Sequence, residues 1–301
     1  MTMQSRLYDG DADRARMLAF LEAANAGGLS TGYFHVGDLI WGMYQNTLFD
    51  PRENIRLWER DGQLLGFAWF DMPNSVNMQI DPALHGQGQL EAEMLEWAGE
   101  RARACQSGSQ DPPKLATWCM ADDQWRDAFL TGRGFVRGSY EMLHFRCDLA
   151  APIAAVAAPG AVVRPVGGED EYQERVDTHR EVWQPSKVTL EAYRRLRAAP
   201  IYRPDLDLVA ALPDGAFAAY CICWLDVANQ IGEFEPVGTR PAWRGRGMGK
   251  AVIVEGLRRL RDAGAHTAIV YTPRKNESAQ KLYQSVGFQI IASEYRYERA
   301  L

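Results

Sequence analysis

The chain has 301 residues, of which 47% are hydrophobic and 24% are charged, and its formal net charge at pH 7 is −6. These ordinary globular values exclude a disordered chain and a small disulfide-stabilised protein. A length near twice 150 residues predicts about two domains. No run of about 18 apolar residues occurs, so we expect no membrane-spanning helix, and the N-terminus lacks the apolar segment of a signal peptide.

The five cysteines form no CxxC pair, and the five histidines show no metal-ligand spacing. We therefore expect a cytoplasmic protein without a metal site. Residues 1–150 hold 13 basic and 21 acidic side chains, whereas residues 151–301 hold 20 and 18. This balance argues against nucleic-acid binding and assigns anion chemistry to the second half.

Near the midpoint, residues 148–160 read DLAAPIAAVAAPG, with one charge and two prolines. Such a segment is typical of a connection between domains. We predict a first domain over residues 1–149, a linker over residues 150–160, and a second domain over residues 161–301.

The second half alternates strand and helix patterns in chain order. A hairpin is predicted over residues 209–225, with Pro213, Asp214 and Gly215 in its turn, and a further strand over residues 231–239. Apolar spacing predicts a helix over residues 250–263, and Asn276 is a candidate N-cap for a helix over residues 277–286. Short strands are expected over residues 267–271, 288–291 and 295–297. The predicted class is α/β, with mixed, mostly antiparallel sheets flanked by helices.

A glycine-rich loop, RGRGMG over residues 244–249, separates the strand at 231–239 from the helix that follows. Its glycines let main-chain N–H groups approach a ligand, and the helix start and the nearby cations favour an anion. A P-loop is excluded because Arg244 and Ala251 occupy the required glycine and serine or threonine positions. The glycine spacing also fails the dinucleotide-binding pattern. A phosphate or diphosphate ligand is predicted.

This loop resembles the acetyl-CoA pyrophosphate loop of the GNAT N-acetyltransferases, and residues 276–288 resemble the last helix and strand of that family. The resemblance covers residues 161–301 and implies a GNAT fold with acetyl-CoA as acyl donor. The cofactor-binding residues that it implies are Val237, Gly238, Thr239, Arg244, Gly245, Arg246, Gly247, Met248, Gly249, Lys250 and Asn276.

The first half repeats these motifs weakly, as expected for tandem domains of one family. Residues 81–89 align with residues 240–248, and residues 129–135 align with residues 282–288. The corresponding positions differ in chemistry: Arg244, Arg246, Gly249, Glu233, Glu235 and Tyr283 become His85, Gln87, Leu90, Asn74, Val76 and Leu130. We expect a non-catalytic first domain with a collapsed cofactor cleft.

Transfer of an acetyl group to a primary amine requires a base for the amine proton and an acid for the departing thiolate. The resemblance implies Glu233 as the base, with Glu235 as the second candidate. Period-two spacing places both on one strand face with Val237 and Thr239. Tyr283 is implied as the acid, and the main-chain N–H groups of residues 237–239 would hold the thioester.

The acceptor is expected to be a small-molecule amine, bound near Trp183, Tyr193 or Tyr202, in a protein that is a monomer or a homodimer. Alternatives remain open at this point. They are another acyl donor, an amine on a protein, or a non-enzymatic CoA-binding sensor. The sequence does not identify the amine.

Overall fold

The computed structural model describes residues 3–26, 32–108 and 110–301, which form two compact units. Unit 1 contains the N-terminal residues through Phe34, then Asp50–Leu143 and Ala292–Leu301. Unit 2 contains His35–Phe49 and His144–Ile291. Each unit is therefore built from more than one stretch of the chain.

Unit 1 is a mixed sheet with helices. Its helices are α1 (Asp11–Ala24), α3 (Pro51–Asn54), α4 (Gln89–Cys105) and α5 (Gln124–Thr131). Its strands are β1 (Gln4–Leu7), β2 (Ile55–Arg60), β3 (Gln63–Asp71), β4 (Ser75–Ile80) and β5 (Lys114–Met120), with the first part of β6 (Val136–Asp148) and most of β12 (Gln289–Ala300). The strand order is β1-β2-β3-β4-β5-β12, with β4 and β5 parallel.

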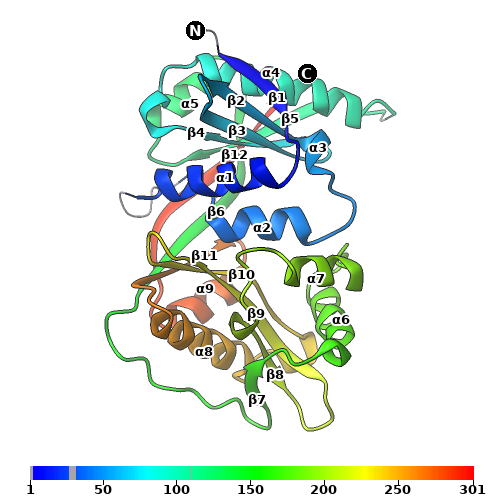
Figure 1. The fold of residues 1–301 in the computed structure, drawn as a ribbon, viewed down its shortest axis with the longest axis vertical. Helices are drawn as coiled ribbons and strands as arrows, with labels where there is room; N and C mark the ends of the chain where they lie inside the picture. The colour runs from blue at the N-terminus through cyan, green and yellow to red at the C-terminus, as the bar shows by residue number, and fades with distance from the viewer. Residues whose placement is uncertain (1–2, 27–31, 109) are drawn as a thin grey trace. The chain divides into compact units, whose positions relative to one another are not determined.

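Unit 2 has the same plan (Figure 1). Its helices are α2 (Val36–Tyr44), α6 (Tyr172–Val182), α7 (Leu190–Arg197), α8 (Met248–Asp262) and α9 (Glu277–Gln284). Its strands are β7 (Val162–Pro165), β8 (Asp207–Ala211), β9 (Phe217–Asp226), β10 (Ile231–Thr239) and β11 (Thr267–Pro273), in the order β6-β11-β10-β9-β8-β7. Within unit 2, β10 and β11 form a parallel pair. The predicted fold class is confirmed.

Local patterns in the second half predicted most of these elements. The hairpin appears as β8 and β9, and β10 covers the predicted strand residue for residue. Gly264 and Gly287, each with φ near +100°, follow α8 and α9 where a left-handed residue closes a helix. The two short strands expected after α9 are instead one strand, β12. Residues 150–160 contain no helix or strand, and the predicted domain boundaries around them stay a prediction.

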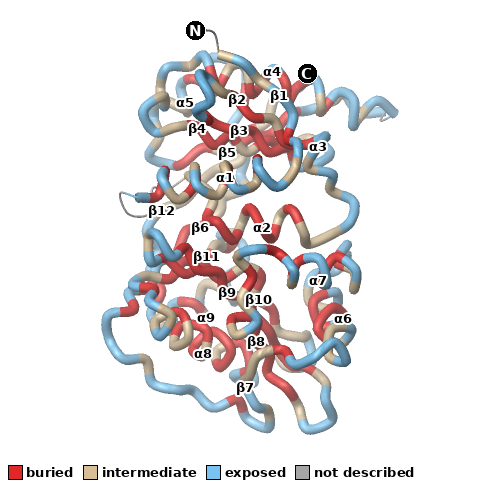
Figure 2. The backbone as a smooth tube through the Cα atoms, viewed as in Figure 1, coloured by how far each residue is buried: buried red, intermediate tan, exposed pale blue. Residues whose placement is uncertain are grey.

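Strand β9 is buried along its whole length because helices cover both of its faces (Figure 2). Tyr220 faces α6, where its hydroxyl lies 2.7 Å from His179 Nδ1. Cys221 and Cys223 face α8, and the Cys221 thiol donates to the Val252 carbonyl.

Helix α2 comes from the first 50 residues of the chain, yet it belongs to unit 2 (Figure 1). It packs on β9, β10 and α7 through the buried side chains of Val36, Leu39, Ile40, Trp41 and Met43. No pattern within residues 36–44 shows which unit this apolar helix covers. Among the described residues, no helix is long and apolar enough to cross a bilayer.

We expect Leu39→Ala to lower the free energy of unfolding by about 2–5 kcal/mol, because Leu39 is a fully buried residue of α2. Denaturant unfolding measures the change. Leu48→Ala is the matched control, since Leu48 is 60% exposed and its truncation should leave stability nearly unchanged. Equal losses in the two variants would contradict the packing of α2 described above.

Candidate active site

Strands β10 and β11 separate partway along their length. Their parallel register runs from Ile231 to Glu233 and extends no further among the described residues. Beyond this point β10 continues to pair with β9 as far as Thr239. The β11-facing edge of residues 234–239 is therefore open, which supports a role of these main-chain groups in holding an extended ligand.

A β-bulge between Phe234 and Val237 changes the faces of the sheet to which the following side chains of β10 point. Glu233 is paired with Trp224, whereas Val237 is paired with Cys221, which points to the opposite face of β9. Side chains of paired residues share a face, so Glu233 and Val237 lie on opposite faces. The period-two prediction that Glu233, Val237 and Thr239 share one face is wrong, because the bulge inserts an extra residue at Glu235 and Pro236.

The glycine-rich loop leads directly into α8. Gly245 and Gly247 have φ of +73° and +83°, conformations that side-chain-bearing residues rarely adopt. Arg244 and Arg246 are exposed, Lys250 is partly buried, and none of the three forms an ion pair with the described residues. Arg240, by contrast, contacts Glu174 and Glu181. Free cations at a helix start of this kind can bind a phosphate group.

Gly249 has a packing role of its own. A Cβ built there would lie 2.7 Å from Thr239 Oγ1 and 3.3 Å from Leu282 Cδ2. Its absence allows α8 to approach β10 and α9 closely. Met248 is buried beside it and begins the helix.

Unit 1 repeats the loop backbone closely. Gly86 and Gly88 have φ of +86° and +82°, and Gly88 precedes α4 as Gly247 precedes α8. Short 3-10 helices at Pro82–Leu84 and Pro241–Trp243 come before the two loops. The backbone supports the predicted repeat.

The unit 1 loop already holds a carboxylate of its own chain. Glu91 is fully buried, and its oxygens accept hydrogen bonds from the main-chain N–H groups of Gly86 at 3.4 Å and Gly88 at 3.1 Å. The equivalent residue of unit 2 is Lys250. His85 is further paired with Asp123 at 3.2 Å and lies against Trp125. The loop donors of unit 1 are thus used internally.

Glu233 is fully buried at the N-terminus of α2. Its Oε2 atom lies 2.9 Å from His35 Nδ1. Burial, with the charge of Glu235 as a smaller cause, raises the pKa of Glu233 to about 8, and the neighbouring Asp38 opposes the rise. Burial also raises the pKa of Asp38 well above its usual range. A group of carboxyls with raised pKa values is typical of a functional site.

Glu235 lies in the bulge and is partly exposed. Its carbonyl accepts a hydrogen bond of 2.6 Å from Trp224 Nε1, which holds the bulged backbone in place. Burial raises the pKa of its carboxyl to about 8, and the charge of Asp38 adds to the rise. Glu235 is therefore the more accessible of the two glutamates.

Tyr283 is buried on α9 between the rings of Phe145 and Phe288. Burial raises its pKa, and the charge of Glu235 is the next contribution, which places the two groups within electrostatic reach. Among the described residues its hydroxyl has no hydrogen-bond partner. Asn276 caps α9 by accepting a 3.3 Å hydrogen bond from the Ala279 N–H. The role of Asn276 toward a cofactor stays a prediction.

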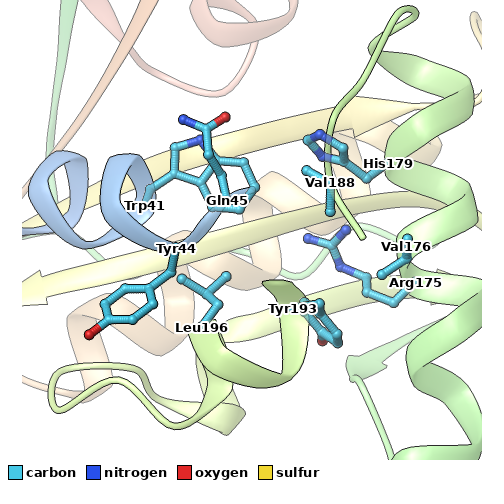
Figure 3. Close-up of a pocket in the computed structure, with 9 residues that line it drawn as sticks. All are labelled: Trp41, Tyr44, Gln45, Arg175, Val176, His179, Val188, Tyr193 and Leu196. Atoms are coloured by element: carbon cyan, nitrogen blue, oxygen red, sulfur yellow. The ribbon is translucent and has the colours of Figure 1, made fainter. Parts of the chain in front are cut away.

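A narrow pocket lies between α2, α6 and α7 (Figure 3). Trp41, Arg175, His179 and Tyr193 line it. Arg175 is buried and is paired with the fully buried Asp207 at 3.1 Å. Asp207 also accepts hydrogen bonds from the hydroxyls of Tyr193 and Tyr202.

Two of the three aromatic residues predicted to lie near the acceptor, Tyr193 and Tyr202, belong to this cluster. Tyr193 lines the pocket. The hydroxyl of Tyr202 donates a hydrogen bond to Asp207, and Trp183 is 48% exposed. Sequence reasoning missed Arg175 and Asp207, and it missed His35 and Asp38. The H-x-x-D spacing of the latter pair is a capping-box signal for a helix start, but it does not reveal Glu233 as a neighbour.

Residues 169–288 match the model of the acetyltransferase (GNAT) family. A mycothiol acetyltransferase of Kineococcus radiotolerans is 29% identical over 79% of this chain and 78% of its own length. Another, from Thermobispora bispora, is 25% identical over 99% of this chain and 100% of its own.

Two solved structures share the fold. A GCN5-related N-acetyltransferase from Sphaerobacter thermophilus has a TM-score of 0.70 and 17% identity, and the match covers 99% of this chain and 95% of that one. A tandem GNAT protein from the clavulanic acid biosynthesis pathway has a TM-score of 0.65 and 14% identity over 99% and 98%.

With the glycine-rich loop and the separated strands, these matches define the class of protein. The chain carries a GNAT acetyltransferase domain, and the protein is an acyltransferase. Among its relatives, the two described by name above are mycothiol acetyltransferases.

We expect Lys250→Glu to weaken acetyl-CoA binding at least about 100-fold, roughly 2.7 kcal/mol. The new carboxylate can accept from the Gly245 and Gly247 N–H groups, as Glu91 does in unit 1. Lys250→Gln is the control and should lose only the contribution of one charge. Calorimetric titration measures both affinities.

The loss should occur without unfolding, because an acidic side chain in the first turn of a helix stabilises it. An unchanged melting temperature therefore belongs to the expected result. Unaltered affinity in Lys250→Glu would rule out this loop as the cofactor cradle.

Proposed function

We propose that the protein transfers the acetyl group of acetyl-CoA to a primary amine of a small molecule, by direct attack in a ternary complex. The observation that carries this proposal is the glycine-rich loop of unit 2. It has three cations without ion-pair partners among the described residues, and it lies beside the open edge of β10. Unit 1 lacks this combination, so we propose one donor site per chain.

The donor would be held in two places. Arg244, Arg246 and Lys250, with the N–H groups at the start of α8, fit a diphosphate. Main-chain groups of Val237, Gly238 and Thr239 fit the pantetheine arm, because this edge has no β11 partner among the described residues. N–H donors at that edge would polarise the thioester carbonyl as the tetrahedral intermediate forms.

We assign the base to Glu235. A base must reach the amine proton directly or through one water, and Glu235 is the glutamate with exposed surface. Glu233, the other glutamate implied as a base, is fully buried beneath α2. Glu235 takes the ammonium proton, the neutral amine attacks the thioester carbon, and the carbon–sulfur bond breaks as the intermediate collapses.

Tyr283 fits the acid. Its hydroxyl has no competing hydrogen-bond partner among the described residues, and its raised pKa keeps it protonated and able to donate a hydrogen bond. A hydrogen bond from the phenol to the sulfur would stabilise the negative charge on the departing CoA thiolate as the carbon–sulfur bond breaks, and protonation of the thiolate would follow.

The acceptor class follows from the relatives. Their name, mycothiol acetyltransferase, refers to a small molecule, and we extend that class to this chain. Release of free thiol from acetyl-CoA with a panel of amino acids, amino sugars and polyamines tests the proposal. Tight CoA binding without turnover on any amine would favour a CoA sensor instead.

Tyr283→Phe should lower kcat by about 10²–10³-fold with little change in the KM for acetyl-CoA, because only the proton donor is removed. Steady-state thiol release measures both constants. Tyr295→Phe is the matched control, since Tyr295 stacks on Arg137 through its ring and lies in unit 1. Full activity of Tyr283→Phe would remove the tyrosine from the mechanism.

The raised pKa of Glu235 fixes the direction of the pH dependence. A base with a pKa of about 8 is mostly protonated at pH 7 and becomes active as pH rises. We expect kcat/KM to increase tenfold per pH unit below about pH 8 and then to level off. Glu235→Gln should abolish this limb, and a limb near pH 4.5 would contradict the assignment.

A further inference from the structure

Three carboxyl groups lie together where the first turn of α2 packs against β10. They belong to Asp38 of α2 and to Glu233 and Glu235 of β10, and we call them the acidic cluster. Burial is the largest cause of the raised pKa of each group, and the charge of another member is the next cause. The three groups are therefore within electrostatic reach of one another, and they repel one another when ionised.

The acidic cluster has no countercharge in the part of the chain that the structure describes, since no lysine or arginine there lies within ion-pair distance of it. Other carboxyls of unit 2 are matched with arginine. Asp207 lies 3.1 Å from Arg175, and Glu174 lies 2.8 Å from Arg240. The missing countercharge is therefore a local property of the cluster rather than a general one of the unit.

Glu233 is the inner member of the cluster. It is fully buried, and neither of its carboxyl oxygens has a hydrogen-bond partner among the described residues. A Cβ at Gly37 would lie 2.5 Å from Oε2, so the first turn of α2 covers this carboxyl. His35 Nδ1 lies 2.9 Å from Oε2, but it accepts from the Gly37 N–H, and burial lowers the pKa of the ring, so His35 supplies no charge. An ionised carboxyl without a partner is costly to bury.

Asp38 and Glu235 form the accessible side of the cluster, since each keeps some exposed surface. The main-chain N–H of His35 donates to Asp38 Oδ2 at 2.9 Å, which fixes this carboxyl at the helix start. No step of the proposed mechanism uses Asp38. An ammonium group has three donors and a full positive charge, so it can contact two carboxyls at once. Placed between Asp38 and Glu235, it would supply the missing countercharge.

Acetyl transfer restricts which ammonium group this can be. The reacting amine must lose its proton before it attacks, so it is no longer a cation when the acetyl group is transferred. A second ammonium group on the same acceptor keeps its charge throughout. We propose that the acidic cluster binds this second ammonium group, so that the preferred acceptor is a diamine or a polyamine. This inference rests on the proposed function of the same site and names its substrate class.

The position of the cluster along β10 fits such an acceptor. Glu235 precedes Val237, where the open edge would hold the thioester, by two residues. That separation is at most about 7 Å along a strand. A chain such as 1,5-diaminopentane can span it, with one amine at the thioester and the other between Asp38 and Glu235.

Three primary amines of equal chain length test the proposal. They are 1,5-diaminopentane, 1-aminohexane and 5-aminopentanoate, whose far ends are cationic, neutral and anionic. We expect kcat/KM for the diamine to exceed that for 1-aminohexane at least about tenfold, mostly through KM, with 5-aminopentanoate the poorest. Thiol release from acetyl-CoA measures all three. Equal values for the diamine and the monoamine would overturn the proposal.

Asp38→Asn is the test variant, because the asparagine oxygen can still accept from the His35 N–H at the helix start. We expect the advantage of the diamine to disappear, while kcat/KM for 1-aminohexane stays almost unchanged. The melting temperature should not fall, because one of three mutually repelling groups is removed. Asp262→Asn is the matched control on α8, and it should keep the full advantage, since the Asp262 side chain is 63% exposed and paired with Arg261.

Two results with Asp38→Asn would overturn the proposal. One is a diamine advantage equal to that of the unmodified protein. The other is an equal loss of activity on the diamine and on 1-aminohexane, because a merely structural role would lower both together.

A binding measurement does not depend on turnover. Calorimetric titration of the full chain, with CoA present, should show at least about tenfold tighter binding of 1,5-diaminopentane than of 1-aminohexane, and Asp38→Asn should remove the difference. Equal affinities in the unmodified protein would overturn the assignment of the cluster. If no amine is acetylated, the proposed function fails, while this titration still decides whether the cluster binds an ammonium group.

Discussion

The packing of α2 against the carboxyl group of Glu233 is the contact on which the arrangement of the candidate site in unit 2 depends. Glu233 is the last residue of β10 that pairs with β11, and it is paired across β9 with Trp224. A buried carboxyl needs a partner or must lose its charge, and α2 brings His35 and Asp38 to it. At Glu233, therefore, the parallel pairing with β11 ends, the open edge of β10 begins, and a carboxyl group is fully buried.

The two glycine-rich loops share one backbone geometry, but the helices that follow them have side chains of opposite charge at the equivalent position, Glu91 and Lys250. The glycines before α4 and α8 have nearly the same dihedral angles. In unit 1 the first turn of the helix offers Glu91, which fills the loop from within. In unit 2 the corresponding residue is Lys250, which cannot accept hydrogen bonds from the loop N–H groups. The two backbones are alike, and under the proposed function the charge of this one side chain would decide whether a phosphate group can bind.

The parts of unit 2 that were predictable depend on short-range physics. A hairpin turn, an Asn cap and glycines with positive φ are set by neighbouring residues, so β8, β9, α8 and α9 appear where their patterns placed them. The cationic loop could be recognised for the same reason. The faces of β10 could not, because the bulge at Glu235 and Pro236 breaks the two-residue period that the prediction used.

By itself the sequence determined the fold class, the repeated loop and the cations of its second copy, since each is written within a few neighbouring positions. The tertiary structure alone decided that α2 joins unit 2, that Glu233 is sealed while Glu235 keeps exposed surface, and that Arg175 pairs with Asp207. These depend on contacts between residues as many as 198 positions apart, such as His35 with Glu233. Burial and pairing across such separations change the charge state of a side chain without changing the local pattern around it.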